Sequence, residues 1–316
     1  CLRRLAAENI SIRSKRKMIT VKETRFENWN CVSVSDGRVE ALVTVDMGPR
    51  IISLTLNGGS NHMAVHPETR GKVSDSDRFV AYGGHRVWHA PETHERTYFS
   101  DNKKVTYEMR EDGCTFTSQL ETETMTRRGF DVAMTDKGEI VVTHFIKNEG
   151  LFDIDLSIWG LSQFANGGLL VAPHSTVDTG LVANECISLW PYGRMTDPRV
   201  YWGDKYITVS PDSAAKTPFK FGMSLNEGYA AYFNHGQLFV KKMEYYYDCE
   251  YPNYGCNFES YTNAAFIEIE SLSPLMTIEA GETETLVEKW SLFDGVEKPA
   301  RDDEAAIAAA LGKAGL

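Results

Sequence analysis

The stretch "YGGHRVWHAPETHE", residues 82–95, packs three histidines, an arginine, a tryptophan and two glutamates into fourteen residues, all of them types that can do acid–base or ligand chemistry. His85 and His89 are four residues apart, a spacing that on a helix would place both imidazoles on one face as metal ligands. A glycine pair precedes them, Pro91 follows, and valine and tryptophan favour an extended chain. Four residues of a strand span about 13 Å, too far for two imidazoles to share one ion. We therefore expect a strand here and no metal site.

The alternation of a strand would separate the side chains of this stretch onto two faces. Arg86 and Trp88 would face one way, and His85 and His89 the other. An indole offers a flat apolar surface to a sugar ring, and a guanidinium offers a fork of donors to hydroxyls or a carboxylate. We expect Arg86 and Trp88 to contact a carbohydrate. The alternative is a buried tryptophan with the arginine extending past it.

A second candidate is "FIEIES", residues 266–271. On a strand, Glu268 and Glu270 share one face while two isoleucines point into a core. On an outer surface the glutamates would be plainly solvated. In a cleft, burial could raise the pKa of a carboxyl into the range that is useful for proton transfer. The composition leaves both readings open.

The third candidate is the loop "LWPYGRMTDPR", residues 189–199. It is rich in aromatic and charged residues, and its prolines make it rigid. Trp190, Tyr192 and Asp197 are its candidate ligand contacts, because loops of this kind often border binding sites. It could equally cap the end of a barrel.

The elements that must position these residues are β-strands almost throughout. Short runs rich in Val, Ile, Thr, Tyr and Phe alternate with turn signals such as "SDG", "NGG" and "TDKG". The clearest expected strands are residues 39–46, 50–56, 139–148, 152–161, 266–271 and 284–293. The spacing fits one large antiparallel sandwich or barrel over residues 18–296. Residues 297–316 read as a C-terminal helical tail with a thin apolar stripe, Ile307 and Leu311.

Composition narrows the classes of function. The 316 residues carry a net charge of -11, which argues against nucleic acid as a partner. No run approaches 18 apolar residues, so no membrane span is expected, and no cofactor motif is present. The six scattered cysteines indicate free thiols and a cytoplasmic protein, with a single disulfide as the alternative. The basic segment 1–17 is expected to be a disordered tail, and Cys1 as the processed end of a lipoprotein is the alternative.

Two longer stretches resemble the galactose-mutarotase-like (aldose 1-epimerase-like) superfamily, in an uncharacterised bacterial branch. "VTVDMGPRIISLTLNGGSNHM", residues 43–63, is similar to its opening strands, with a Gly-x-Arg-Ile strand followed by a glycine turn. "AFIEIESLSPLMTIEAGETETLVEKWSL", residues 265–292, is similar to its ending, where a Glu-bearing strand leads to a proline, a Gly-Glu turn and a last strand. The resemblance covers most of residues 19–294.

The resemblance implies an all-β fold, a large antiparallel β-supersandwich with a sugar bound on the concave face of one sheet. It also implies that a glutamate near the C-terminus takes the anomeric proton while a histidine protonates the ring oxygen. Glu270 matches the glutamate by its place before the proline, and Glu268 is the fallback. Arg86 resembles the sugar-contacting arginine of the early strands, and Arg50 matches an arginine with a structural role.

One departure from the family pattern concerns the acid. The family places its histidine in a middle strand, and the corresponding region here, residues 152–164, has none. The acid would then be His85, His89 or His174.

The leading hypothesis is a cytoplasmic, carbohydrate-binding isomerase without a cofactor, acting by epimerase-type proton transfer on a free sugar or sugar acid. It would act as a monomer or homodimer on a small-molecule carbohydrate. The alternatives are a non-catalytic carbohydrate-binding or sensing domain, and a lyase or hydrolase of uronic-acid polymers.

Overall fold

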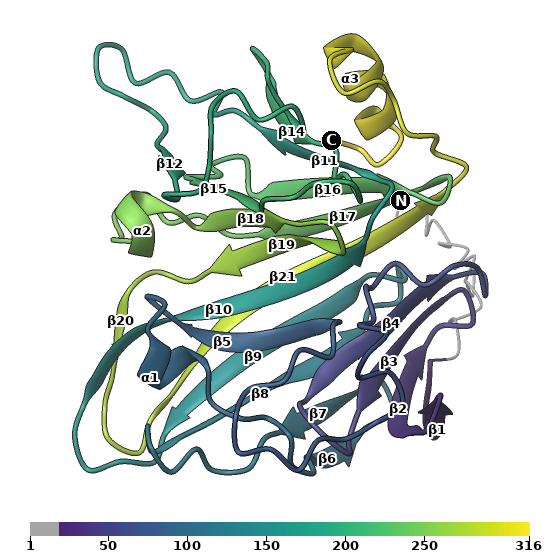
Figure 1. Ribbon diagram of the computed structural model, residues 1–316, viewed down its shortest axis with the longest axis vertical. Helices are drawn as coiled ribbons and strands as arrows, with labels where there is room; N and C mark the ends of the chain where they lie inside the picture. The colour runs from purple at the N-terminus through teal and green to yellow at the C-terminus, as the bar shows by residue number, and fades with distance from the viewer. Residues whose placement is uncertain (1–18) are drawn as a thin grey trace, which may run out of the picture.

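Two large antiparallel sheets face each other in the computed structural model, which describes residues 19–316 (Figure 1). The first sheet has eleven strands in the order β1-β2-β3-β4-β5-β10-β19-β18-β15-β12, with β20 pairing to β10. Its strands are β1 (Thr20–Phe26), β2 (Trp29–Ser35), β3 (Val39–Thr44), β4 (Arg50–Leu56), β5 (His85–Ala90), β10 (Ile154–Ala165), β12 (Ile187–Leu189), β15 (Phe219–Met223), β18 (Phe258–Thr262), β19 (Phe266–Leu272) and β20 (Met276–Ile278).

The second sheet has ten strands in the order β13-β14-β11-β16-β17-β21-β9-β8-β7-β6. Its strands are β6 (Thr106–Met109), β7 (Gly113–Thr117), β8 (Thr126–Met134), β9 (Ile140–Asn148), β11 (Leu169–Pro173), β13 (Val200–Trp202), β14 (Tyr206–Val209), β16 (Tyr229–Asn234), β17 (Gln237–Met243) and β21 (Thr283–Asp294). The short helices are α1 (His94–Thr97) and α2 (Pro252–Gly255), and the C-terminal helix is α3 (Glu304–Gly312).

Hydrophobic alternation explains why these segments form a sandwich. Buried and partly buried residues alternate along the whole of β9, as expected for a strand with one face in a core. In contrast, β5 and β19 are buried on both faces. Their inner face packs against the second sheet, so their outer face must be covered by something other than the core.

The expected all-β sandwich with a short C-terminal helix is confirmed. Asp303 caps α3, because its side chain accepts a hydrogen bond from the Ala306 backbone N–H. Ile307 and Leu311 are buried against apolar residues of β11, β16 and β17, so the thin stripe docks this helix on the second sheet.

Some of the expectations fall outside the described residues. The basic segment 1–17, with Cys1, lies there. Within residues 19–316, none of the helices has the length and apolar character needed to cross a membrane.

Candidate functional site

A cleft of about 280 Å³ lies on the outer face of the first sheet. Side chains from β5, β10, β15, β18 and β19 form its floor, and the loops at residues 66–81 and 92–98 and at Tyr192 form its walls. Its lining is mostly aromatic with a few charged or amide groups: His66, Phe79, Ala81, Arg86, Trp88, Glu92, Tyr98, Trp159, Leu161, Gln163, Tyr192, Lys220, Tyr261, Phe266 and Glu268. This mixture of apolar walls and few convergent polar groups is typical of small-molecule sites.

One end of the cleft holds a hydrogen-bonded chain of three side chains, Glu268, Gln163 and His66. Gln163 on β10 and Glu268 on β19 are directly opposite each other in the sheet, and Gln163 Nε2 donates to Glu268 Oε1 at 2.8 Å. His66 Nε2 lies 2.8 Å from Gln163 Oε1, and its ring meets Phe266 edge-on. Neither Glu268 Oε2 nor His66 Nδ1 has a hydrogen-bond partner within residues 19–316. A carboxylate oxygen and an imidazole nitrogen are therefore both free for a ligand.

Arg86 and Trp88 lie on the cleft face of β5, as the strand alternation predicts. The Arg86 guanidinium stacks over the Trp88 ring, 4.2 Å from its centroid, and reaches Glu268 Oε1 at 3.3 Å. Its buried Nε has no hydrogen-bond partner among the described residues. This is an arginine held by stacking, with donors left over for a hydroxyl.

Glu270 shares the face of Glu268 but lies beneath the cleft floor, fully buried. Its Oε2 accepts hydrogen bonds from Trp159 Nε1 at 2.9 Å and from Lys220 Nζ at 3.0 Å. Lys220 also pairs with Glu259 at 2.6 Å, and its ammonium lies 4.7 Å from the ring centroids of both Trp159 and Trp190. Glu270 is therefore sealed by an indole and an ammonium.

Burial decides the protonation of this pair. It raises the pKa of Glu270 to about 8, against the pull of the Lys220 charge. Burial disfavours the Lys220 ammonium, but Glu270 and Glu259 outweigh that effect and raise the pKa of Lys220.

Titration of Glu270 should be visible in tryptophan fluorescence. The Trp159 indole donates directly to this carboxyl, so its emission should change with an apparent pKa of about 8. Glu270→Gln, which keeps the shape and an acceptor, should abolish this transition. The assignment is wrong if the same transition persists in the variant.

The same titration has a defined effect on stability. Between pH 4.5, the ordinary pKa, and about 8, the folded state holds a proton that the unfolded state has released. The free energy of unfolding should therefore fall as pH rises through this window, by up to about 1.4 kcal/mol per pH unit from this group. Glu270→Gln should lack this component of the slope in denaturation curves measured from pH 5 to 9.

The loop at residues 189–199 contributes unequally to the site. Tyr192 lines the cleft, and Trp190 packs on the Lys220 ammonium just beyond it. Asp197 turns away and forms an ion pair with Arg199 at 2.8 Å. His174 pairs with Glu185 at 3.0 Å and does not line the cleft.

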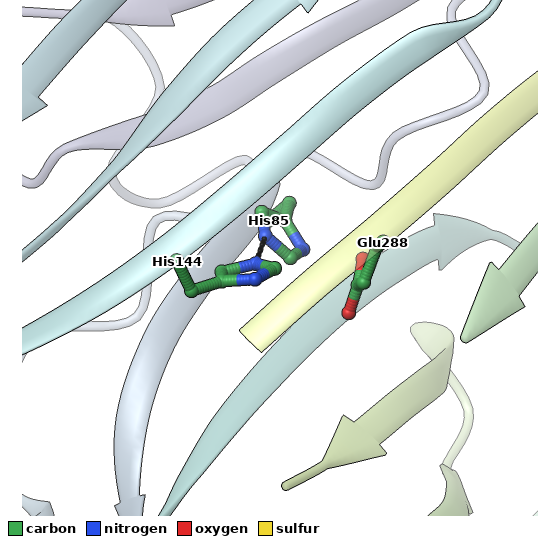
Figure 2. Close-up of side chains that lie close together, drawn as sticks. All are labelled: His85, His144 and Glu288. Atoms are coloured by element: carbon green, nitrogen blue, oxygen red, sulfur yellow. Dashed lines mark hydrogen bonds between the residues drawn. The ribbon is translucent and has the colours of Figure 1, made fainter. Parts of the chain in front are cut away.

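His85 and His89 point to the opposite side of β5, into the sandwich. His89 is buried near Thr126 and Glu121. His85 belongs to a fully buried cluster with His144 on β9 and Glu288 on β21 (Figure 2). The structure therefore places the predicted acids His85, His89 and His174 away from Arg86, Trp88 and Glu268.

The buried cluster has the donor types of a zinc site, and Lys241 lies beside its carboxylate. Figure 2 shows the hydrogen bond between His85 Nε2 and His144 Nε2, which measures 2.7 Å. Lys241 Nζ donates to Glu288 Oε1 at 3.1 Å, to Ser162 Oγ at 2.9 Å and to the Ile269 carbonyl at 2.8 Å.

The tautomers of the two imidazoles follow from their partners. His144 Nδ1 donates to the Leu286 carbonyl, so its Nε2 accepts the proton of His85 Nε2. His85 Nδ1 then accepts from Ser162 Oγ at 2.8 Å. Burial, followed by His144 and then the cations Lys241 and Arg86, lowers the pKa of His85 well below its ordinary value, in keeping with a neutral ring. The Lys241 ammonium already supplies a positive charge beside Glu288, which argues against a metal ion at this cluster.

Among the cleft residues that the sequence reasoning missed are His66, Gln163 and Lys220. His66 lies on an irregular loop, where no periodicity marks it. Gln163 and Lys220 stand at alternating positions in apolar strands, "SIWGLSQF" and "FKFGM", and polar side chains buried in such strands are the signal that could have found them.

Arg50 has a structural environment. It is fully buried on β4, donates to the Gly83 carbonyl and pairs with Asp101 at 2.6 Å.

No protein-family model and no curated protein matches the chain. Solved structures with the same fold do match. A galactose mutarotase-like protein from Clostridium acetobutylicum superposes with a TM-score of 0.53 and 16% identity over 88% of this chain and 99% of its own. One from Lactobacillus casei gives 0.53 and 13% identity over 83% and 100%.

A TPR-domain containing protein from Parabacteroides distasonis gives a TM-score of 0.54 with 13% identity over 84% of this chain. The chain spans about half of that protein, 47% of its length. The likeness to the two galactose mutarotase-like proteins shows that the fold of this chain is galactose mutarotase-like.

Proposed function

We propose that this protein is a carbohydrate-binding isomerase that interconverts the anomers of a free sugar by proton transfer in the cleft. Glu268 is the base and His66 the acid. The observation that carries the proposal is the Glu268–Gln163–His66 chain, which leaves one carboxylate oxygen and one imidazole nitrogen free within an aromatic cleft. The galactose mutarotase-like fold of the chain supports it.

In the proposed reaction the anomeric hydroxyl of the sugar gives a proton to Glu268, and the ring oxygen of the sugar receives a proton from His66. Glu268 Oε2 takes the proton of the anomeric hydroxyl while protonated His66 Nδ1 gives one to the ring oxygen, so the ring C–O bond breaks and an open-chain aldehyde forms. Rotation about C1–C2 exposes the other face of the carbonyl. Reclosure reverses both proton transfers, and no proton is gained or lost over the cycle.

The side chains that line the cleft would position the sugar ring. A volume of about 280 Å³ is at the small end of ligand pockets, whose usual range begins at ~300 Å³, and suits one sugar ring. Trp88 and Tyr261 offer apolar faces to ring C–H groups, and Arg86 offers donors to a hydroxyl. This size argues against the long groove that a lyase or hydrolase of polymers would need.

The test is NMR magnetisation exchange between α and β anomers over a panel of aldoses and uronic acids, with and without the protein. Exchange above the spontaneous rate on at least one sugar supports the proposal. Ligand line broadening without faster exchange would overturn catalysis and leave a binding domain.

That binding domain is the second candidate, and one observation favours it. The cleft face of β10 carries Trp159, Leu161 and Gln163, none of which titrates, where a catalytic histidine was expected. The exchange measurement separates the two candidates directly.

The charge balance of the cleft predicts selectivity for an uncharged sugar. Its cations are already neutralised, Arg86 by Glu268 and Lys220 by Glu259. A substrate carboxylate would have to compete with these buried carboxylates. We expect kcat/KM for a uronic acid to be at least about tenfold below that of the matching aldose, equivalent to about 1.4 kcal/mol.

The measurement compares each sugar pair at one ionic strength, because surface charge effects are screened by salt. A preference for the uronic acid that disappears in Arg86→Gln would show that the arginine exchanges partners, and would contradict this prediction.

A further inference from the structure

We infer that Gln163 is a positioning residue that assigns the two nitrogens of His66, holding Nε2–H out of the reaction and presenting Nδ1 to the ligand. This inference rests on the proposed function for the use made of Nδ1. The assignment itself rests on contacts and can be tested without a sugar.

The hydrogen bond to Glu268 fixes the orientation of the Gln163 amide. Its Nε2 donates to Glu268 Oε1 at 2.8 Å, and a flipped amide would instead set its carbonyl oxygen against a carboxylate oxygen. The carbonyl oxygen of Gln163 must therefore face His66, whose Nε2 lies 2.8 Å away. Since that oxygen can only accept, His66 Nε2 must carry a proton.

The remaining nitrogen is the one that can react. His66 Nδ1 has no hydrogen-bond partner within residues 19–316, and His66 lines the cleft. Gln163 itself is buried, with 4% of its surface exposed, so water does not replace either of its bonds readily. The other charged groups lining the cleft, in addition to Glu268, are Arg86, Glu92 and Lys220, and none of them has a hydrogen bond or ion pair with His66.

The two hydrogen bonds of Gln163 persist before and after each proton transfer. When Glu268 has taken a proton on Oε2, its Oε1 still accepts from Gln163. When His66 has released a proton from Nδ1, its Nε2–H still donates to Gln163. The bridge therefore keeps the reactive atoms Oε2 and Nδ1 facing the ligand throughout, which avoids a ring flip between the two steps.

The first test is spectroscopic and uses the free protein. The ¹⁵N shifts of the two ring nitrogens of neutral His66 should report a single tautomer with the proton on Nε2. Gln163→Met removes the acceptor and should give a mixture of tautomers. Gln163→Glu restores an acceptor and should return the single tautomer, which also guards against a misfolded methionine variant.

The second test is kinetic. Gln163→Met should lower kcat for anomer exchange by about tenfold or more with KM within about twofold, because the residue orients the acid and base without holding the sugar. Gln119→Met, on an exposed glutamine, is the matched control and should change neither.

Two results would overturn the inference. They are a proton on Nδ1 in the wild-type protein, and an unchanged His66 spectrum in Gln163→Met. A wild-type protein that shows the Nε2–H tautomer but no anomer exchange would instead overturn the proposed function and leave the Gln163 assignment standing.

Discussion

Glu268→Gln is expected to lower the rate of anomer exchange by about 10²–10⁴-fold, the usual effect of removing a general base. The glutamine can still accept from Gln163 and Arg86 through its carbonyl oxygen, so the floor of the cleft should keep its shape. What is lost is the basic oxygen Oε2, the carboxylate atom of Glu268 that has no hydrogen-bond partner among residues 19–316. The fall should therefore appear in kcat, and KM should change little.

Glu270→Gln is the decisive comparison, because the family resemblance alone assigns the base to Glu270. That carboxyl is fully buried under Trp159 and Lys220 and does not line the cleft. We expect Glu270→Gln to retain exchange within about tenfold of the wild type. Glu282→Gln, on an exposed glutamate, controls for the loss of one charge.

The assignment of the base would be reversed by the opposite pattern. Loss of exchange in Glu270→Gln together with retention in Glu268→Gln would mean that a sugar displaces Trp159 or Lys220 to reach the deeper carboxyl. Loss in both variants would mean that the two glutamates act as one unit, which the rate of the double variant would show.

Local patterns predicted the elements of the site well. The glycine pair and Pro91 around "HRVWHA" correctly indicated a short strand, and its alternation correctly separated Arg86 and Trp88 from His85 and His89. The reason is that strand periodicity depends only on neighbouring residues and on which face is apolar.

The choice between Glu268 and Glu270 could not be made in this way. Both lie on one face of β19, and what distinguishes them is the residue opposite each. Glu268 faces Gln163, whereas Glu270 faces Leu161 and Glu259 and is covered by Lys220 from β15, about fifty positions earlier in the chain. Register across four strands is a tertiary property, and the sequence of one strand does not contain it.

His66, the proposed acid, could not be predicted from the sequence for the same reason. His66 reaches the cleft because its loop runs beside β10, where Ala64 N–H donates to the Gln163 carbonyl. No pattern within "MAVHPETR" marks this histidine, and its partner Gln163 lies about a hundred residues later. His85 and His89 stood out because three histidines lie close together in that stretch of the sequence. In the structure these two belong to a buried network on the other face of β5.

That network carries the largest expected effect on stability. Lys241→Met should lower the free energy of unfolding by about 3–5 kcal/mol, because it leaves the buried Glu288 carboxylate without its counter-charge. Both side chains of this pair are fully buried, so solvent does not compensate. The substitution also removes the donor to Ser162 and to the Ile269 carbonyl, which join the two strands that carry Gln163 and Glu268.

Urea denaturation followed by tryptophan fluorescence would measure the loss. Lys242→Met, the next residue on β17, points to the exposed side and should leave the denaturation midpoint unchanged. Glu288→Gln added to Lys241→Met should recover about 1–3 kcal/mol, because the uncompensated charge is then gone. A double variant less stable than Lys241→Met would contradict this account.

The measurement also decides what supplies the positive charge at the cluster. If the Lys241 ammonium does, a chelator should not move the wild-type unfolding midpoint, because Glu288 is already neutralised and both imidazoles already have partners. If a metal ion were held by His85, His144 and Glu288, the chelator should lower that midpoint. Lys241→Met should then cost little, since removing a positive charge beside a bound cation would relieve repulsion. The two accounts therefore predict opposite outcomes in both experiments.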